Sequence, residues 1–573
     1  MVKFLCGLAA GLVLAALSLI LAVFALVRIS ERPPEVNRRS VLVLDLDGPL
    51  VERSPVTIPL PIFEQRAPLT VPDLWRGLHA AESDPRIKAV ILMPGRVTAG
   101  WGKLQEIHAC LVRLVKAGKP VYAFLRTPSG REYYLATAAR RIYMAPEDLL
   151  DLKGVRAELT YFRGTLDKLG VQVEIEHAGK YKDYGDMFTR SSMSPETREV
   201  LDSILDELYR IMVQTIATGR GKNAEQVRAI IDEGPFLSKQ ALAHGLVDGL
   251  LYEDQVFSEL EKVSGAGRLE RISIREYLRA KPATGGPGAG NRVALVAGEG
   301  AIVGEMNPGL DTDSDLEAPA FIKLLREVGR DAGIRAVIVR LDSPGGDSFA
   351  SDEIWREVNI LSKKKPLVIS MSDEAASGGY YISMTGDPIV AYPGTFTGSI
   401  GVVYGKANLR GLYEKLGINK QLLTRGRLAA ADSDFEPLSE EARRKVREAV
   451  DENYHAFVQR VAEARRRKFE QIEPLAQGRV WLGTQAQRNG LVDELGGLDR
   501  ALELARQRAH IPRSEDVTLV VYPGRRSLID RLMSRSDQLR LPASLKSFLA
   551  RWPVTALARG GLLRLMPYSI EVR

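Results

Sequence analysis

The feature that most constrains the fold of this chain is an internal repeat with a nearly constant spacing. Several short segments recur 247 positions further along the chain, and one more recurs 245 positions further. A constant offset over several elements is the signature of a tandem duplication, so the chain is expected to contain one fold twice. The matching segments are Ile87-Lys88-Ala89-Val90-Ile91 with Ile334-Arg335-Ala336-Val337-Ile338, Tyr133-Tyr134 with Tyr380-Tyr381, Leu166-Asp167-Lys168-Leu169-Gly170 with Tyr413-Glu414-Lys415-Leu416-Gly417, and Gly245-Leu246-Val247-Asp248 with Gly490-Leu491-Val492-Asp493.

Within each copy, short apolar strands alternate with amphipathic helices, as at residues 41–44, 88–92 and 120–124. This alternation predicts an α/β fold with a largely parallel sheet. A Gly- and Pro-rich stretch at 281–291 separates the copies. The predicted organisation is an anchor at 1–30, a first copy at 40–262, a linker at 263–291, a second copy at 292–511 and a C-terminal extension at 512–573.

The duplication allows the two copies to be compared with each other. The second copy contains Ala376-Ser377-Gly378-Gly379 after an apolar strand, where the first has Ser129-Gly130-Arg131-Glu132. Small neighbours leave the Ser377 hydroxyl accessible and the backbone N–H groups bare, as a nucleophile loop requires. We therefore expect Ser377 to be a nucleophile and the first copy to have lost this function.

A second glycine-rich segment supports the same interpretation. The second copy carries Asp342-Ser343-Pro344-Gly345-Gly346-Asp347, whereas the first has Met93-Pro94-Gly95-Arg96. Backbone N–H groups at two glycines can stabilise the oxyanion of a tetrahedral intermediate. We predict that the N–H groups of Gly346 and Gly378 form this oxyanion hole.

A serine nucleophile needs a base, and histidine is a poor candidate here. The second copy offers only His455 and His510, both in charged helical sequence with no sign of a triad. The first copy offers Lys180 and Lys182 in a loop after a strand, and the 247 offset places Ala429 opposite Lys182. Spacing alone does not choose between the two lysines. A neutral lysine can act as the base when burial lowers its pKa.

The N-terminal segment is the other long-range constraint. Residues 4–27 contain no charged side chain, slightly more than the roughly 20 residues that span a bilayer. The spacing of Ala22 and Ala25 does not match a signal-peptidase site, so an uncleaved anchor is favoured over a cleaved signal. The short N-terminus predicts that the body of the chain lies outside the cytoplasm.

Composition excludes other classes of function. The net charge of +7 is spread along the chain, without the basic helix and interleaved aromatics of a nucleic-acid-binding protein. The two cysteines form no CxxC pair, and the six histidines show no HExxH motif, so neither a metal site nor a cofactor is expected.

Taken together, these motifs resemble the signal peptide peptidase A (protease IV) family of membrane-anchored Ser/Lys peptidases, in its long, duplicated form. The resemblance covers nearly the whole chain after the anchor. The matching motifs are Ser343-Pro344-Gly345-Gly346, Ala376-Ser377-Gly378-Gly379-Tyr380-Tyr381, Thr397-Gly398-Ser399-Ile400-Gly401-Val402, Gly179-Lys180-Tyr181-Lys182 and Met193-Ser194-Pro195.

The resemblance implies Ser377 as nucleophile, Lys182 as general base and Ser399 as the residue that orients the lysine amine. It implies the ββα spiral of the Clp protease and crotonase superfamily, signal peptides and other extended apolar peptides as substrates, and assembly into a homotetramer. It also implies location in the bacterial inner membrane, with the body on the periplasmic side. Asp183 directly after Lys182 departs from the family pattern, because a carboxylate there opposes a lowered lysine pKa.

Two other functions were weighed against a peptidase. The chain could be a non-catalytic membrane scaffold, since one copy has already lost its site, or a crotonase-type acyl-CoA enzyme. In the C-terminal extension a strand is expected at 517–522. The basic amphipathic stretch at 527–551 is interpreted as a packing or oligomer helix in preference to a lipid-surface helix.

Overall fold

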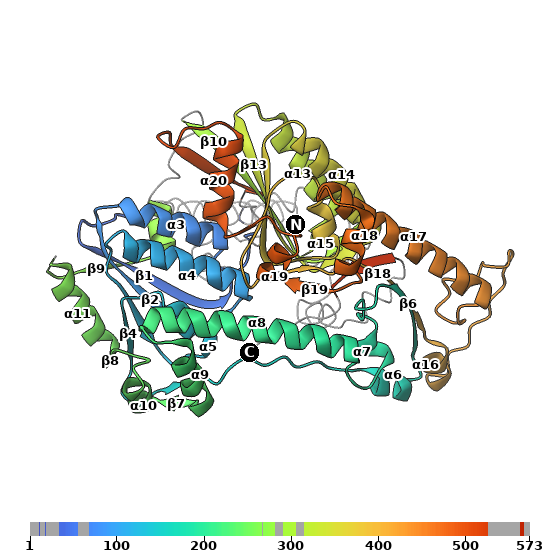
Figure 1. Cartoon of the computed structure of the whole chain (residues 1–573), viewed down its shortest axis with the longest axis horizontal. Coiled ribbons are helices and arrows are strands. Elements are labelled where there is room, and N and C mark those ends of the chain that lie inside the picture. The colour runs from blue at the N-terminus through green and yellow to red at the C-terminus, as the bar shows by residue number, and fades with distance from the viewer. Residues whose placement is uncertain are drawn as a thin grey trace.

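The computed structural model describes Gly11, Ser18 and residues 34–54, 68–265, 267–280, 290–304, 315–524 and 562–566. It shows an α/β fold in which helices cover parallel sheets (Figure 1). The anchor expected at 4–27, most of the Gly/Pro stretch and the amphipathic stretch at 527–551 lie outside the described residues. Among the residues that are described, no helix is long and apolar enough to cross a membrane.

The first copy is built on a six-stranded parallel sheet with the order β8-β4-β3-β2-β1-β9. Its central strands are apolar and buried on both faces, as expected for a parallel sheet. The strands are β1 (Ser40–Pro49), β2 (Ile87–Thr98), β3 (Val121–Leu125), β4 (Arg141–Met144), β8 (Gly249–Leu250) and β9 (Glu270–Ser273), and a separate pair is formed by β5 (Leu149–Leu150) and β7 (Phe236–Leu237).

The second copy repeats this arrangement around the strands β19-β17-β15-β13-β10-β21. All neighbours on this path are parallel except β17 and β19, and β16 pairs with both β15 and β20. The strands are β10 (Asn291–Glu299), β13 (Ile334–Ser343), β15 (Leu367–Ala376), β16 (Ile389–Ala391), β17 (Phe396–Gly398), β19 (Val480–Leu482), β20 (Glu494–Leu495) and β21 (Val517–Tyr522).

Equivalent side chains make the same hydrogen bonds in both copies, which confirms the duplication. The hydroxyl of Tyr133 donates to the carbonyl of Leu246 at 2.8 Å, and that of Tyr380 donates to Leu491 at 2.8 Å. The edge strands also correspond, because β9 pairs with β1 as β21 pairs with β10.

The positions of β9 and β21 differ from the expected boundaries. Both strands belong to the main sheets, so the first copy continues past residue 262 through β9 and the second past 511 through β21. Only the later part of the predicted linker remains available to connect them. The first copy ends later than expected because β9 is short and weakly apolar, and the second because the strand expected at 517–522 pairs with β10 and is not part of a separate extension.

The helices of the first copy cover its sheet and extend beyond it. The longest, α8, begins at the Ser194 cap followed by Pro195 and ends at Gly221, whose φ of +62° suits glycine. The helices are α3 (Val71–Ser83), α4 (Trp101–Lys116), α5 (Gly130–Ala136), α6 (Arg163–Leu169), α7 (Asp186–Thr189), α8 (Pro195–Arg220), α9 (Ala224–Glu233), α10 (Ser238–Ala243), α11 (Glu253–Ser264) and α12 (Ile274–Ala280).

The second copy carries a comparable set of helices. Its longest, α17, begins after the cap Ser439 and corresponds in order to α8. The helices are α13 (Ala318–Arg330), α14 (Ser348–Ser362), α15 (Gly378–Ile382), α16 (Arg410–Lys415), α17 (Glu440–Ala464), α18 (Phe469–Ile472), the 3₁₀ turn η1 (Glu473–Leu475), α19 (Gly483–Arg488) and α20 (Leu498–Arg508).

A third sheet joins the two copies. Its order is β12-β11-β14-β22-β18-β6, and β6 comes from the first copy whereas β22 comes from the C-terminal extension. Figure 1 shows β6, α6 and α7 beside α16 and α17, at the far end of α8 from α5. The strands are β6 (Gln172–Ala178), β11 (Ile302–Val303), β12 (Leu316–Glu317), β14 (Gly345–Asp347), β18 (Val402–Asn408) and β22 (Leu562–Leu565). This sheet carries a loop of the first copy into the second.

Candidate active site

Ser377 lies at the end of β15, where the strand turns directly into α15. The strand continues to Ala376, further than its apolar part suggests, so no loop separates it from the serine. The backbone of Ser377 has φ +53° and ψ −111°, a conformation that is costly for a residue with a side chain. Its N–H donates to the carbonyl of Gly398 at 2.8 Å, and its side chain is fully buried. The turn fixes the direction of the hydroxyl.

Lys182 reaches this serine from the first copy. It follows β6, which pairs with β18 along seven residues of antiparallel register. The N–H of Tyr181 donates to the carbonyl of Gln477 at 2.7 Å, and a Cβ on Gly478 would lie 2.5 Å from the backbone nitrogen of Lys182. The Gln477-Gly478 turn of the second copy therefore holds the lysine loop at a distance that only glycine permits.

The amine of Lys182 makes three close contacts. Its Nζ lies 2.8 Å from Ser377 Oγ, 2.9 Å from Ser399 Oγ and 3.0 Å from the carbonyl oxygen of Ser399. All three residues have no exposed surface. The structure therefore brings Ser377, Lys182 and Ser399 together at one point between the two copies.

Lys180 points in the opposite direction. Its side chain is 55% exposed, and its amine lies 3.9 Å from Glu199. The chain turns after β6 through Gly179, whose φ is +107°, and the two amines end on different sides, with that of Lys180 towards solvent and that of Lys182 against Ser377. The choice that the spacing left open is thus resolved in favour of Lys182 as the lysine that contacts the serine.

Burial lowers the pKa of the Lys182 amine well below its usual range. The Asp183 carboxylate raises this pKa, and the Arg564 guanidinium lowers it further, but burial outweighs both neighbours. Asp183 turns away to accept a hydrogen bond from the hydroxyl of Thr197, at the start of α8. Burial raises the pKa of Asp183 itself to about 7, which weakens its negative charge near neutral pH.

Ser399 is held as firmly as Ser377. It follows β17, has φ +51°, and its N–H donates to the carbonyl of Arg479 at 2.7 Å. This places both oxygens of Ser399 on the same amine. A residue in this position restricts the amine to one orientation.

The two predicted oxyanion glycines lie in different surroundings. Gly378 begins α15 directly after Ser377. A Cβ on Gly345 would lie 2.7 Å from the backbone nitrogen of Gly378. Gly346, by contrast, packs on Ile302, because a Cβ there would lie 2.0 Å from the Ile302 carbonyl oxygen. Gly345, which is not one of the two predicted residues, therefore lies close to the backbone N–H of Gly378. The role of Gly346 stays a prediction.

A buried charge cluster links the first copy to the segment before the glycines. The Lys103 amine, in α4, lies 2.6 Å from Asp342 and 3.3 Å from Glu299. The N-terminus of α4 is capped across the copies, since the N–H of Lys103 and of Gly100 each donate to Asp373 at 2.7 Å. Burial lowers the pKa of Lys103, but the surrounding carboxylates raise it well above its usual value. The cluster keeps α4 against β13 and β15, which lead into the site.

Sequence reasoning missed three contributors to this site. Lys103 is an ordinary helix lysine in sequence, and only its apolar neighbours hint at burial. Gly478 lies in an Ala-Gln-Gly-Arg run with no motif to mark it. The strand Leu562–Leu565 was missed as well, although its short apolar run after Gly560-Gly561 is a weak strand signal.

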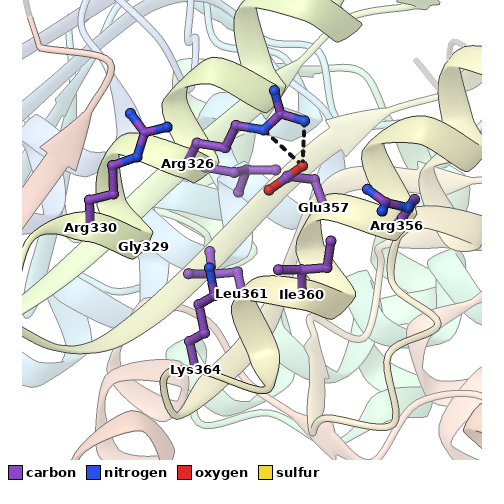
Figure 2. A pocket seen from close by; sticks show the side chains of 9 residues that line it. Arg326, Gly329, Arg330, Arg356, Glu357, Ile360, Leu361 and Lys364 are labelled. Atoms are coloured by element: carbon purple, nitrogen blue, oxygen red, sulfur yellow. Dashed lines mark hydrogen bonds and ion pairs between the residues drawn. The ribbon is translucent and has the colours of Figure 1, made fainter.

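A separate pocket lies on the outer side of the second copy. It has a volume of about 310 Å³ between α13 and α14 (Figure 2). Its rim is basic, and Arg326 pairs with Glu357 at 2.9 Å. None of the site residues lines it. The candidate active site is therefore distinct from this pocket.

Comparison with known proteins decides the family. The model of peptidase family S49 matches residues 113–267 and 359–512, one region in each copy. The chain belongs to peptidase family S49. It is a serine peptidase. This finding excludes the non-catalytic scaffold and the acyl-CoA enzyme, the two alternatives that the sequence alone left open.

Similar family S49 proteins extend over most of the chain. The chain is 34% identical to the chloroplastic serine protease SPPA of Arabidopsis thaliana, covering 85% of this chain and 71% of the relative. It is 31% identical to Protease 4 of Salmonella typhi, covering 90% and 86% of the two chains, and 30% identical to Protease 4 of Haemophilus influenzae, covering 85% and 82%.

Two solved structures match shorter parts of this S49 peptidase. A mutant of the membrane-bound stomatin-specific protease 1510-N is 15% identical, with a TM-score of 0.27, and the match covers 41% of this chain and 99% of the other. ClpP1 from Listeria monocytogenes is 17% identical, with a TM-score of 0.21, and the match covers 35% and 91%.

Proposed function

We propose that this S49 peptidase cleaves peptide bonds with a dyad of Ser377 and Lys182, one residue from each copy. The observation that carries the proposal is the 2.8 Å separation between Lys182 Nζ and Ser377 Oγ at a fully buried point. A serine hydroxyl is a weak nucleophile until a base takes its proton. Burial favours the neutral form of the lysine amine, the form that can act as the base, because it lowers the pKa of Lys182.

The three contacts of the amine fit its neutral form. A neutral amine has two N–H donors and one lone pair. The two donors fit the oxygens of Ser399, and the lone pair then faces the hydroxyl of Ser377. In this arrangement Ser399 orients the base, and Lys182 accepts the proton as the serine oxygen attacks the substrate carbonyl.

The rest of the reaction uses the same groups. The N–H of Gly378, with that of Gly346 as a second donor, stabilises the oxyanion, each worth about 3–4 kcal/mol in the transition state. Protonated Lys182 then donates to the leaving amine, and water attacks the acyl-enzyme with Lys182 again as base. In acylation the proton of Ser377 passes through Lys182 to the leaving amine, and in deacylation a proton of water passes through Lys182 to Ser377, so the complete cycle restores both residues.

We further propose that the substrates are extended apolar peptides at a membrane surface, with cleaved signal peptides as the principal class. The charge-free segment at 4–27 supports an anchor in the bacterial inner membrane, with the body on the periplasmic side. The ββα spiral of the Clp and crotonase superfamily belongs to the same proposal and is supported by the parallel, duplicated sheets.

The proposed function is tested by mapping the residue that a covalent serine-hydrolase label modifies and by measuring the turnover of a peptide substrate. A fluorophosphonate label is expected on Ser377 of the wild-type protein, with hydrolysis of a synthetic signal peptide in detergent. No label on Ser377 and no hydrolysis, with the chain folded by circular dichroism, would overturn the proposal. An acyl-CoA thioester serves as a control substrate that the enzyme should leave intact.

We propose that the peptidase assembles into a homotetramer in which the copies of adjacent chains pair head to tail. Within one chain β6 pairs with β18. Their counterparts at the 247 offset, residues 419–425 and 155–161, are in no described strand. Leu423 is 92% exposed in the first of these segments. Pairing 419–425 of one chain with 155–161 of the next would repeat the β6–β18 contact.

The assembly is tested by mass measurement in detergent. Leu423→Asp is expected to yield smaller species, whereas the matched variant Leu242→Asp, at a site 40% exposed in the wild type, should leave the tetramer intact. A tetramer that persists in Leu423→Asp would exclude this contact.

A further inference from the structure

The C-terminal strand β22 occupies a position beside the catalytic residues. It pairs antiparallel with β14 on one side and with β18 on the other. β14 contains the glycine pair, and β18 begins three residues after Ser399. No described strand other than β22 lies between β14 and β18, so without it both would present unpaired backbone groups next to Ser377.

The approach of β22 to the glycines is unusually close. Gly345 has φ +101°, and a Cβ there would lie 2.0 Å from the carbonyl oxygen of Arg564. The N–H of Met566 also donates to the carbonyl of Pro344 at 2.8 Å. Gly345 is thus required for a strand to lie in this position. A glycine that admits a peptide backbone beside a nucleophile is what strand addition by a substrate needs.

The side chain of Arg564 fills a defined site, which we call the Arg564 site. It is 3% exposed, with its guanidinium 3.8 Å from the ring of Tyr381 and 5.2 Å from that of Phe457. Its Nη1 donates to the carbonyl of Ser348 at 3.2 Å. Ring faces and a carbonyl oxygen favour a cation. The hydroxyl of Tyr381 donates to the carboxylate of Asp352 at 2.5 Å, and this carboxylate adds negative charge behind the ring.

The fit of Arg564 is incomplete. Its Nε is buried and finds no hydrogen-bond partner among the described residues. A buried cation with an unpaired donor carries a desolvation cost, which offsets part of the backbone pairing. A free peptide that fits this strand position better can therefore displace β22.

We propose that the strand position between β14 and β18 is the peptide-binding site of the peptidase, that β22 fills it as a tethered peptide, and that the Arg564 site selects a long cationic side chain in substrates. The inference rests on the proposed function of the same site. A tethered peptide competes at an effective concentration of roughly millimolar. The full chain is accordingly held in a partly blocked state.

The first test uses point variants of the full chain. Arg564→Asp would bury an unpaired carboxylate and should release β22. On the alkaline plateau of the pH profile, where the effect of Arg564 on the Lys182 pKa no longer limits activity, the expected result is a rise of about tenfold in kcat/KM for an extended peptide substrate, because a millimolar internal competitor is lost. Arg427→Ala, at a side chain that is 85% exposed, is the control and should match wild type. A folded Arg564→Asp protein with unchanged or lower kcat/KM would overturn the proposal.

The second test does not depend on catalysis. A fluorescent peptide with the sequence of residues 560–568 is titrated into the full-length protein carrying both Ser377→Ala and Arg564→Asp. Saturable binding is expected, weakened about tenfold when the arginine of the peptide is replaced by alanine, as the loss of a desolvated cation–π contact implies. No binding, or equal binding of both peptides, would overturn the inference. If the double variant binds the peptide but the wild-type protein does not hydrolyse it, the result would contradict the proposed dyad and leave the proposed peptide-binding site intact.

Discussion

The two copies differ most at the turn after their third strand. In the first copy the carboxylate of Glu132 accepts hydrogen bonds from the backbone N–H of Ser129 and of Val97, both at 2.9 Å. In the second copy the corresponding turn has glycines and Ser377. A built-in carboxylate therefore satisfies backbone donors in the first copy, and the 247 offset places Gly379, which has no side chain, opposite Glu132. The same turn is therefore closed by a side chain in one copy and carries the proposed nucleophile in the other.

The loop after β6 shows the reverse specialisation. In the first copy this loop carries Lys182, which is fully buried against the second copy. In the second copy the 247 offset leads to Ala429, which is exposed. Each copy therefore carries one residue of the proposed dyad and lacks the other. Duplication allows this because the two copies pack against each other, so each of the two residues needs to be present in only one of them.

The largest effect is expected from the serine. Ser377→Ala should reduce kcat by about 10⁴- to 10⁶-fold, because the nucleophile is removed while the site otherwise stays intact. Ser129→Ala, in the equivalent turn of the first copy, should retain activity and lose only a helix cap. Peptide hydrolysis by both purified variants measures the difference. Equal losses would show that the copies share the catalytic role.

The next effect separates the two lysines. Lys182→Met should reduce kcat by about 10²- to 10⁴-fold, the contribution of a general base. Lys180→Met should remain near wild type, because that amine faces solvent beside Glu199. The double variant of Ser377→Ala with Lys182→Met should be no slower than Ser377→Ala, since the two residues act as a unit. A slow Lys180→Met enzyme would contradict the geometry.

The third effect concerns the contact between the copies. Lys103→Met leaves Asp342 and its neighbouring carboxylates buried without their cation, and should lower the free energy of unfolding by about 3–5 kcal/mol. Lys116→Met, on an exposed position of the same helix, should change it little. Urea denaturation followed by circular dichroism compares the two. Similar midpoints would show that the cluster does not hold the copies together.

The smallest effect is a shift in pH dependence. The proposed mechanism requires neutral Lys182, so kcat/KM is expected to rise with pH as the amine loses its proton. Asp183 raises the pKa of Lys182, and therefore Asp183→Asn should move the acidic limb of the kcat/KM profile to lower pH. Asp167→Asn, on an exposed helix, is the control. A shift to higher pH in Asp183→Asn would mean that Asp183 does not oppose ionisation of Lys182 in this way.

Much of this arrangement could be predicted from particular residues. The offset that relates Tyr133 to Tyr380 predicted a duplication that the matched hydrogen bonds confirm. The apolar strands predicted the parallel sheets, and glycines around Ser377 marked its turn. β9 was missed because a short edge strand carries little hydrophobic signal, whereas the strand at 517–522 was predicted but its pairing with β10 was not. The charge cluster at Lys103 had only a weak signal in sequence, the apolar neighbours of the lysine, because its burial depends on what packs against the helix.

The sequence by itself determined the duplication, the α/β class and the two loops in which a nucleophile and a base could lie. The α/β class and the two loops are local properties of a few dozen residues, and the duplication is visible in the sequence because similar segments recur at a nearly constant offset. The tertiary structure decided which lysine contacts Ser377, how β6 reaches the second copy, and that β22 lies beside the glycines. These features depend on contacts between segments about 200 residues apart, and the packing that creates them has no local signature in the chain.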